Sequence, residues 1–261
     1  MSDEVLYDVR NGVAVLTLNR PERRNAFTMT LIHRWADLLE AANADDAVRA
    51  IVVTGAGGAF CAGIDLDVLA SLDPSALTRR DFLTDEVHRV ARAVERSDKP
   101  IIAAVSGAAV GAGMDMALMC DMRIVGPSTS FAASYVRLGL VPGDGGCYYL
   151  PRLVGVAKAL ELLLTGDAVS GTEAAALGLA NHVVADDEVL PFTVALAERI
   201  AAQPPISVKL IRRTVYQSQD IDLRTSLDLI ASHMGVIMTT DDHQEALAAF
   251  REKRPGTFTG K

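Results

Sequence analysis

The segment that most constrains the fold runs from Val105 to Asp121, where glycines separate two apolar runs. The first apolar run spans residues 101–105, and the second contains a single carboxylate, Asp115. An apolar strand, a glycine-rich turn and an apolar helix in this order are typical of a buried α/β layer. Burying an acid among apolar side chains costs free energy unless the acid is bonded or used, so Asp115 is a candidate functional residue.

The predicted start of this helix offers a second piece of chemistry. The first backbone N–H groups of a helix have no partner within it, and the helix dipole favours negative charge there. A developing oxyanion could therefore be held at the glycines that precede Asp115. The segment thus predicts an oxyanion-binding turn with an acid about one helical turn away.

Strands and helices alternate over about the first two-thirds of the chain, which predicts parallel strands with helical crossovers. Asn11-Gly12, between two runs of β-forming residues, predicts a hairpin, and Thr28 or Thr30 is the expected N-cap of the first long helix. A turn over residues 142–146 precedes a short helix. The expected strands are 5–9, 13–18, 50–54, 101–105, 122–125 and 129–132, and the expected longer helices are 31–42, 81–94, 157–164, 172–177 and 187–202.

The last third of the chain has only helical periodicity, with helices expected over 208–216, 223–238 and 241–252. We therefore divide the chain into an α/β core, residues 1–203, and a C-terminal helical region, residues 204–261. A helical segment of about 60 residues rarely builds a core of its own. We expect it to pack on the first domain or on a neighbouring subunit.

Composition excludes several classes of function. Half of the 261 residues are apolar and 22% are charged, as in globular proteins. The net charge is −8 with no basic block, which argues against a nucleic-acid partner. Glycine or aspartate interrupts the longest apolar runs before they reach membrane-spanning length, so no membrane association is expected.

The cysteines and the N-terminus predict a cytoplasmic location. Cys61, Cys120 and Cys147 are odd in number and lie in apolar or glycine-rich surroundings, which indicates free thiols in a reducing compartment. The first residues are acidic and contain no apolar stretch typical of a signal peptide.

Two glycine-rich loops, residues 55–64 and 106–113, each follow an apolar strand. Neither matches a phosphate-binding fingerprint. The glycines could serve only tight turns, or the two loops could approach each other and present backbone donors to one anion. The histidines show no metal-ligand spacing, and His33 and His88, on predicted helices, are interpreted as surface or packing residues.

These motifs resemble the enoyl-CoA hydratase/isomerase, or crotonase, superfamily, in order and over nearly the whole chain. The resemblance implies a spiral of β-β-α repeats, with a C-terminal helical region that helps to build trimers or dimers of trimers. It also implies an acyl-CoA thioester substrate and no metal or organic cofactor. The matching segments are RPERRNAF (20–27), GAGGAFCAGIDL (55–66), AAVSGAAVGAGMD (103–115), CDMRI (120–124), LGLVPGDGG (138–146) and LTGDAVSGTEAAALGLA (164–180).

By this resemblance, the backbone N–H groups of Ile64 and Ala112 form the oxyanion hole. A thioester carbonyl gains negative charge as it becomes an enolate, and each fixed donor contributes roughly 3 kcal/mol to its stabilisation. Because the backbone supplies the donors, changing either side chain should matter little. The residues that match the CoA-binding positions of the family are Arg24, Ala26, Ala62, Asp65 and Leu66.

The acids depart from the family pattern. Hydratases of this family use two glutamates; Asp115 matches the first position, whereas Tyr135 occupies the second. Asp144, in the sequence PGDGG, is a third candidate, because some β-diketone-cleaving members place a catalytic Asp at this turn. Each has a structural alternative: Asp115 as a bonded buried acid, Asp144 as a helix N-cap, and Tyr135 as pocket lining.

The favoured hypothesis is an enoyl-CoA hydratase that adds water to a 2-enoyl-CoA. Asp115 would deprotonate water, and Asp144 or Tyr135 would supply or relay the second proton. An enoyl-CoA isomerase or a β-keto thioester C–C hydrolase that uses Asp115 and Asp144 is the first alternative. A non-catalytic acyl-CoA-binding protein is the second.

Overall fold

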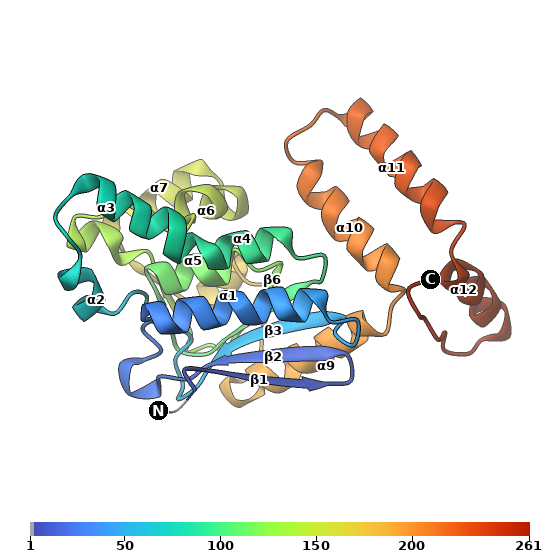
Figure 1. Cartoon of the computed structure of the whole chain (residues 1–261), viewed down its shortest axis with the longest axis horizontal. Coiled ribbons are helices and arrows are strands. Elements are labelled where there is room, and N and C mark those ends of the chain that lie inside the picture. Colours follow the sequence, from blue (N-terminus) through green and yellow to red (C-terminus); the bar gives the residue numbers. More distant parts are fainter. Residues whose placement is uncertain (1–2) are drawn as a thin grey trace.

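The computed structural model describes residues 3–261, and within this range the strands form a six-stranded sheet and a three-stranded sheet (Figure 1). The first two residues, part of the segment expected to lack a signal peptide, lie outside the described residues. The larger sheet has the order β1-β2-β3-β4-β6-β9, and the smaller has the order β5-β7-β8. The strands are β1 (Val5–Arg10), β2 (Val13–Leu18), β3 (Ala50–Gly55), β4 (Ile101–Val105), β5 (Ala108–Val110), β6 (Met122–Val125), β7 (Ser130–Ala132), β8 (Ala168–Ser170) and β9 (His182–Val183).

The larger sheet begins with the predicted hairpin. β1 and β2 pair antiparallel, and the turn residues Asn11 and Gly12 have φ angles of 51° and 77°. Positive φ at both central residues is the requirement of the hairpin turns that Asn-Gly favours. Every later pair in this sheet is parallel, from β2–β3 to β6–β9, which confirms the predicted parallel arrangement.

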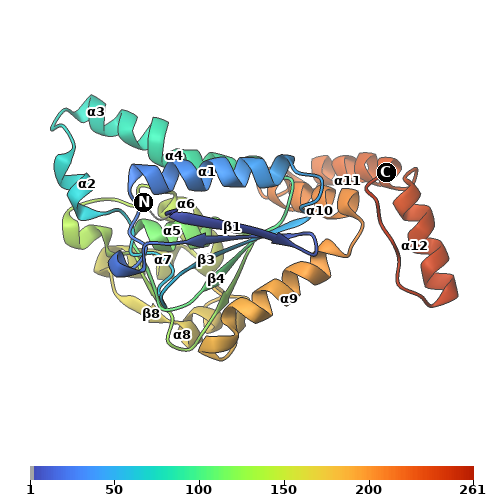
Figure 2. The ribbon, with the colours of Figure 1, turned by 60° about the horizontal axis from the view of Figure 1, so that its bottom comes forward.

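Helices cover both faces of the sheet. The long helix α1 (Met29–Ala44) and α4 (His88–Arg96) lie over one face, and α9 (Val189–Ala201) lies across the other (Figure 2). All five residues of β4 are buried, as a strand covered on both faces requires. Each fully buried Ile of β4 contributes about 1.5–3 kcal/mol to folding. Thr28 is the N-cap of α1, and its side chain accepts from the N–H of Leu31.

Parallel neighbours end at the same edge of a sheet, and this fact places the two glycine-rich loops together. β3 ends at Gly55 and β4 ends at Val105, so both loops leave from one edge. Inside the second loop the structure contains β5, which the sequence interpretation missed. Its three residues pair with β7, some 20 positions away, and so short a strand has little local signal.

The expected helix over 81–94 is longer and irregular. It consists of α3 (Ala76–Asp81), the π-helical segment η2 (Phe82–Val87) and α4. A π-helical turn inserts an extra residue per turn and frequently lies at a functional site. The remaining helices of the core are η1 (Pro21–Arg23), α2 (Leu66–Ser71), α5 (Ala112–Leu118), η3 (Ser134–Leu138), α6 (Gly146–Val154), α7 (Val156–Thr165), α8 (Gly171–Ala176) and η4 (Asp186–Glu188).

The C-terminal helices α10 (Pro205–Gln217), α11 (Leu223–Ile237) and α12 (Asp241–Glu252) extend from one end of the core (Figure 1). Arg212 joins α10 to the core, because its guanidinium donates to both oxygens of Asp121 at 2.9 and 3.0 Å. Many apolar side chains of this region are exposed, including Leu223 at 73% and Phe250 at 85%. The division of the chain at residue 203 stays a prediction.

Candidate active site

The two glycine-rich loops are in direct contact. Val110 N–H donates to the Cys61 carbonyl at 3.0 Å, and Cys61 pairs with Ala109. A Cβ atom added to Gly113 would lie 2.1 Å from the Cys61 carbonyl oxygen, so only glycine allows this approach. Of the two interpretations offered for the glycines, the structure therefore supports the one in which the loops meet.

The N–H groups of Ile64 and Ala112 lie where the loops meet. Gly63, which precedes Ile64 and has a φ of 91°, allows this close approach. A Cβ atom built on Gly63 would lie only 3.4 Å from Ala112 N. Among the described residues, neither N–H has a hydrogen-bond acceptor, whereas their neighbours Asp65 and Met114 donate to Phe27 and Gly111 carbonyls. Two adjacent unpaired donors at the start of α5 can bind one anionic oxygen.

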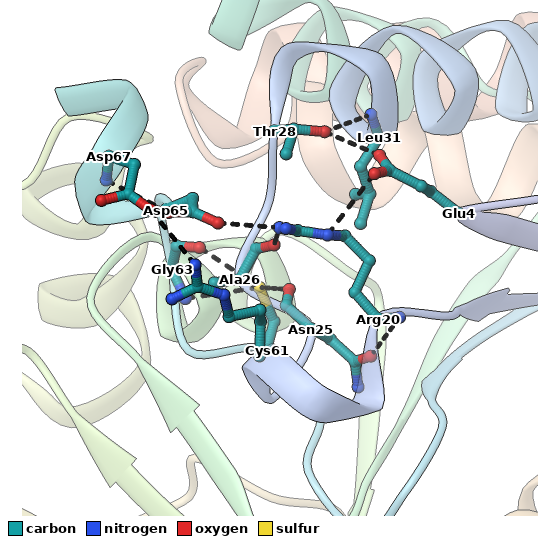
Figure 3. A network of polar contacts seen from close by, with 11 residues as sticks. Glu4, Arg20, Asn25, Ala26, Thr28, Leu31, Cys61, Gly63, Asp65 and Asp67 are labelled. Atoms are coloured by element: carbon teal, nitrogen blue, oxygen red, sulfur yellow. Dashed lines mark hydrogen bonds and ion pairs between the residues drawn. The ribbon is translucent and has the colours of Figure 1, made fainter. Parts of the chain in front are cut away.

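A buried ion pair fixes the first of these loops (Figure 3). Arg20 Nη1 donates to Asp65 Oδ2 at 3.0 Å and also to the carbonyl of Ala26, while Arg20 Nε lies 3.4 Å from Glu4 Oε1. Burial raises the pKa of Asp65, but the Asp67 N–H and the Arg20 guanidinium outweigh this effect, so its pKa is below its ordinary value. Asp65 is thus a charged anchor beside Ile64.

The predicted CoA-binding residues belong to two segments that contact each other, residues 20–28 and residues 55–66. Arg24 has a φ of 51° and an exposed side chain, and its carbonyl accepts from Ala62 N–H at 2.9 Å. Leu66 begins α2 and is 60% exposed, so it is available to a ligand. Ala26 directly precedes Phe27, which forms an isolated bridge with Ile64. Asp65, in contrast, is buried and bonded to Arg20, which suits a structural position better than ligand contact.

Asn25, which sequence reasoning had not singled out by itself, connects these segments (Figure 3). Its side chain is fully buried and donates to the carbonyls of Ala56 and Ala59 at 2.9 and 2.7 Å. Its Oδ1 accepts from Arg20 N–H at 2.9 Å. A satisfied buried amide specifies one arrangement, and here it ties the start of the β3 loop to the 20–28 segment.

The three candidate side chains for proton transfer form one cluster. The Tyr135 hydroxyl lies 2.8 Å from Asp115 Oδ2 and 3.3 Å from Asp144 Oδ2. Gly146 N–H, at the start of α6, donates to Asp115 Oδ2 at 3.0 Å. Asp115 and Asp144 are only 1% and 6% exposed. The hydroxyl has one proton, so it can donate to one carboxylate and accept from the other when that acid is protonated.

Burial governs the protonation of this cluster. It raises the pKa of Asp115 to about 7, against the opposing bonds from Tyr135 and Gly146, and the nearby Asp144 charge adds to the rise. It raises the pKa of Asp144 to about 6, against the opposing charge of His88 and the Tyr135 bond. Burial and the two acids also raise the pKa of Tyr135 far above its ordinary value. Between about pH 6 and 7 the pair of acids therefore shares about one proton.

Asp144 is not a helix cap. The N-cap of α6 is Gly145, with φ of 103°, and no side chain caps it. The carboxylate that binds the first N–H of α6 belongs to Asp115 instead. A Cβ on Gly146 would lie 2.4 Å from Asp115 Oδ1, so glycine at this position gives the acid its place. The capping interpretation of Asp144 is excluded by this geometry.

His88, interpreted from the sequence as a surface or packing residue, is half-buried and contacts the turn that contains Asp144. Its Nε2 lies 2.7 Å from the Gly143 carbonyl oxygen, directly before Asp144. The two residues are 55 positions apart, so no local pattern could have paired them. His33 contacts Glu86 of η2 and stays outside the cluster.

A cavity of about 670 Å³ lies elsewhere, between α4, α6 and α10. One of the cations that line it, Arg212, is already paired with Asp121 and with the carbonyls of Ser97 and Val94. Because Arg212 is paired in this way, whereas the N–H groups of Ile64 and Ala112 have no acceptor among the described residues, we place the chemistry at Asp115 and those N–H groups. Within the described residues, no group of three or more His, Cys, Asp or Glu side chains comes together as a metal site would require. None of the described helices has the length and apolar character needed to span a membrane.

Comparison with known proteins identifies the family. The family model for enoyl-CoA hydratase/isomerase matches residues 8–261. A protein of Syntrophomonas wolfei named crotonyl-CoA hydratase is 36% identical, with 99% of each chain covered. Escherichia coli 1,2-epoxyphenylacetyl-CoA isomerase is also 36% identical, over the full length of both. The solved structure of enoyl-CoA hydratase from Bacillus anthracis has a TM-score of 0.93 at 32% identity, covering 99% of this chain and 100% of that one, which confirms the crotonase-like fold. The chain belongs to the enoyl-CoA hydratase/isomerase family.

Proposed function

We propose that this protein is an enoyl-CoA hydratase, which adds water to the double bond of a 2-enoyl-CoA. The observation that supports this reaction best is the buried cluster of Asp115, Tyr135 and Asp144, one helical turn from the unpaired Ala112 N–H. Hydration needs one group to remove a proton from water and another to deliver a proton to carbon. A pair of acids that shares one proton meets both needs.

In the proposed reaction the water oxygen attacks the β-carbon of the substrate, and Asp115 accepts the proton that water loses. The reacting form has the shared proton on Asp144; because the pKa of Asp115 is about 7 and that of Asp144 about 6, this form is about tenfold rarer than the one with the proton on Asp115. The π electrons move toward the thioester, whose oxygen becomes an enolate oxygen held by Ile64 and Ala112 N–H groups. Each such donor is worth roughly 3 kcal/mol in the transition state. The α-carbon then takes a proton from Asp144, directly or through the Tyr135 hydroxyl.

The CoA part of the substrate is proposed to bind over Arg24, Ala26, Ala62 and Leu66, the residues that flank Ile64. Arg24 offers an exposed guanidinium for the CoA phosphates, and backbone groups of the other residues remain close to the surface. Asp65 contributes by holding this segment through Arg20. We propose that the reaction needs no metal or organic cofactor.

The assembly is proposed to be a homotrimer or a dimer of trimers in the cytoplasm. Exposed apolar side chains along the C-terminal helices support an assembly, because such a surface is costly to leave in water. Those on α11 and the linker that follows include Leu223, Leu227, Ile230, Met234, Val236 and Met238. The three free cysteines agree with a reducing compartment. Sedimentation of the wild type and of Leu227→Glu tests the assembly: a wild-type monomer would contradict it.

The same residues could also catalyse isomerisation of an enoyl-CoA or hydrolysis of a β-keto thioester. The name of one relative supports isomerisation as an alternative. The E. coli relative is named an isomerase, and Asp115 with Asp144 could move a proton along an acyl chain or direct water onto a β-keto thioester. Incubation with 2-enoyl-CoA, 3-enoyl-CoA and β-ketoacyl-CoA substrates separates them by product mass. Hydration adds one water, isomerisation adds nothing, and hydrolysis adds water and splits the chain.

The variants Asp115→Asn and Asp144→Asn distinguish a hydratase from a non-catalytic acyl-CoA-binding protein. A hydratase loses turnover in both variants while acyl-CoA affinity stays within a few-fold of wild type. A binding protein shows affinity without turnover in every form. Correctly folded wild type that turns over no 2-enoyl-CoA of any chain length would overturn the hydratase proposal.

A further inference from the structure

His88 connects the long irregular helix to the turn that contains Asp144. It begins α4, directly after η2, and its side chain is half-buried. Its Nε2 lies 2.7 Å from the Gly143 carbonyl oxygen. A carbonyl can only accept, so Nε2 must carry a proton and donate it, whichever charge state the ring has.

A second contact from the same helix face supports this connection. A Cβ built on Gly143 would lie 3.5 Å from Leu83 Cδ2, so η2 packs directly against the turn. The extra residue of a π-helical turn changes which side chains share a face, and here Leu83 and His88 both reach Gly143. The turn residues that follow place the Asp144 carboxyl and present Gly146 N–H to Asp115.

His88 also belongs to the titratable groups that face Asp144. The others are Asp115 on α5, Tyr135 on η3 and the buried Cys61, whose thiol has its pKa raised to about 12 by burial and stays neutral. Burial disfavours the Asp144 carboxylate, and a protonated His88 opposes that effect. Among these four neighbours, His88 is the one whose charge lowers the pKa of Asp144.

We propose that His88 is a positioning residue for this site: its Nε2–H holds the Gly143 carbonyl and so fixes the Asp144 carboxyl against the Tyr135 hydroxyl. This inference rests on the proposed function, in which Asp144 delivers the second proton. His88 acts through the turn and does not itself touch the substrate. The family motifs of the sequence do not include it.

The test compares His88→Ala, His88→Gln and a matched control, His33→Gln. His33 lies on α1 and contacts Glu86 of η2, the segment that directly precedes His88. It has no hydrogen bond to the turn at Gly143. In His88→Ala we expect kcat to fall about tenfold, equivalent to about 1.4 kcal/mol, with KM changed less than twofold. In His88→Gln the amide N–H can replace the bond to Gly143, so most of kcat should return. The alkaline limb of the kcat–pH profile should move to higher pH in both, because Asp144, the proposed acid, loses a neighbour whose charge lowers its pKa.

Amide hydrogen exchange of residues 143–146 provides a readout that does not need turnover. His88→Ala should exchange faster there than wild type, while His88→Gln and His33→Gln should not. Wild type without turnover, but with this exchange pattern, would refute the proposed function and leave the His88 contact supported. The positioning role is refuted if His88→Ala matches His33→Gln in kcat and exchange, or if KM alone changes. It is also refuted if His88→Gln is as slow as His88→Ala while exchanging like wild type.

Discussion

Replacing Tyr135 with Phe removes the one hydroxyl that joins the two buried acids. In the wild type this hydroxyl lies 2.8 Å from Asp115 and 3.3 Å from Asp144, and its bond lowers the pKa of each acid against the effect of burial. A hydrogen bond to a charged group is worth about 1.5–3 kcal/mol, and one pKa unit corresponds to about 1.4 kcal/mol. The loss of the bond should therefore move the titration of the pair upward by about one to two pH units.

The assay is the pH dependence of kcat/KM for 2-enoyl-CoA hydration, followed as loss of the enoyl thioester absorbance between about pH 5.5 and 9.5. If the active form contains one proton shared by the two acids, the wild-type profile is a bell and both limbs move upward in Tyr135→Phe. On the acid limb, a shift of one unit lowers the rate about tenfold at a given pH. Tyr149→Phe is the matched control, because Tyr149 lies on the neighbouring helix α6 outside the cluster.

Two results would refute this reasoning in different ways. Limbs that stay in place while the rate falls equally at every pH would make Tyr135 itself the proton donor. A profile that matches the Tyr149→Phe control in every respect would make Tyr135 only a wall of the pocket. Either result would remove the hydroxyl from its proposed place between the acids.

Three further changes test other parts of the site. Ala112→Pro removes the N–H at the first residue of α5, where proline suits a helix, so kcat should fall about 10²–10³-fold in steady-state assays while Ala112→Ser stays near wild type. Asp115→Asn should stabilise the protein at pH 8, by about 4 kcal/mol at most, in denaturant titrations. The sign follows because the pKa of Asp115 is raised from 3.8 to about 7, so its charge destabilises the native state above that pH and the cost disappears toward pH 4. Gly113→Ala should unfold or distort the loops, because its Cβ would meet the Cys61 carbonyl at 2.1 Å, and circular dichroism with melting would show a lower Tm.

Local signals in the sequence were enough for much of the fold. Asn11-Gly12 requires the positive φ angles that the hairpin turn has, and Thr28 supplies the side-chain oxygen that caps α1. The apolar run of β4 predicts a strand buried on both faces. β5 was missed because a three-residue strand is defined by its partner β7 and has little pattern of its own.

The candidate site shows the same division between local and long-range information. The glycines of the two loops left open whether the loops only turn tightly or approach each other, and the family motifs predicted which N–H groups form the oxyanion hole. The contacts that decide the roles of the acids join residues far apart: Tyr135 with Asp115, Gly146 with Asp115, and His88 with Gly143. Sequence patterns describe neighbours along the chain, so Asp144 next to two glycines resembled a cap until the structure placed it.

The most direct test of the central claim is the product formed from 2-enoyl-CoA in ¹⁸O-labelled water by wild type, Asp115→Asn and Asp144→Asn. We predict that wild type forms a 3-hydroxyacyl-CoA with one ¹⁸O in the new hydroxyl. Each variant should do so at least about 100-fold more slowly, as expected for loss of a general acid or base, while still binding the acyl-CoA. Unchanged rates in both variants, or a product without the label, would contradict hydration by this pair of acids.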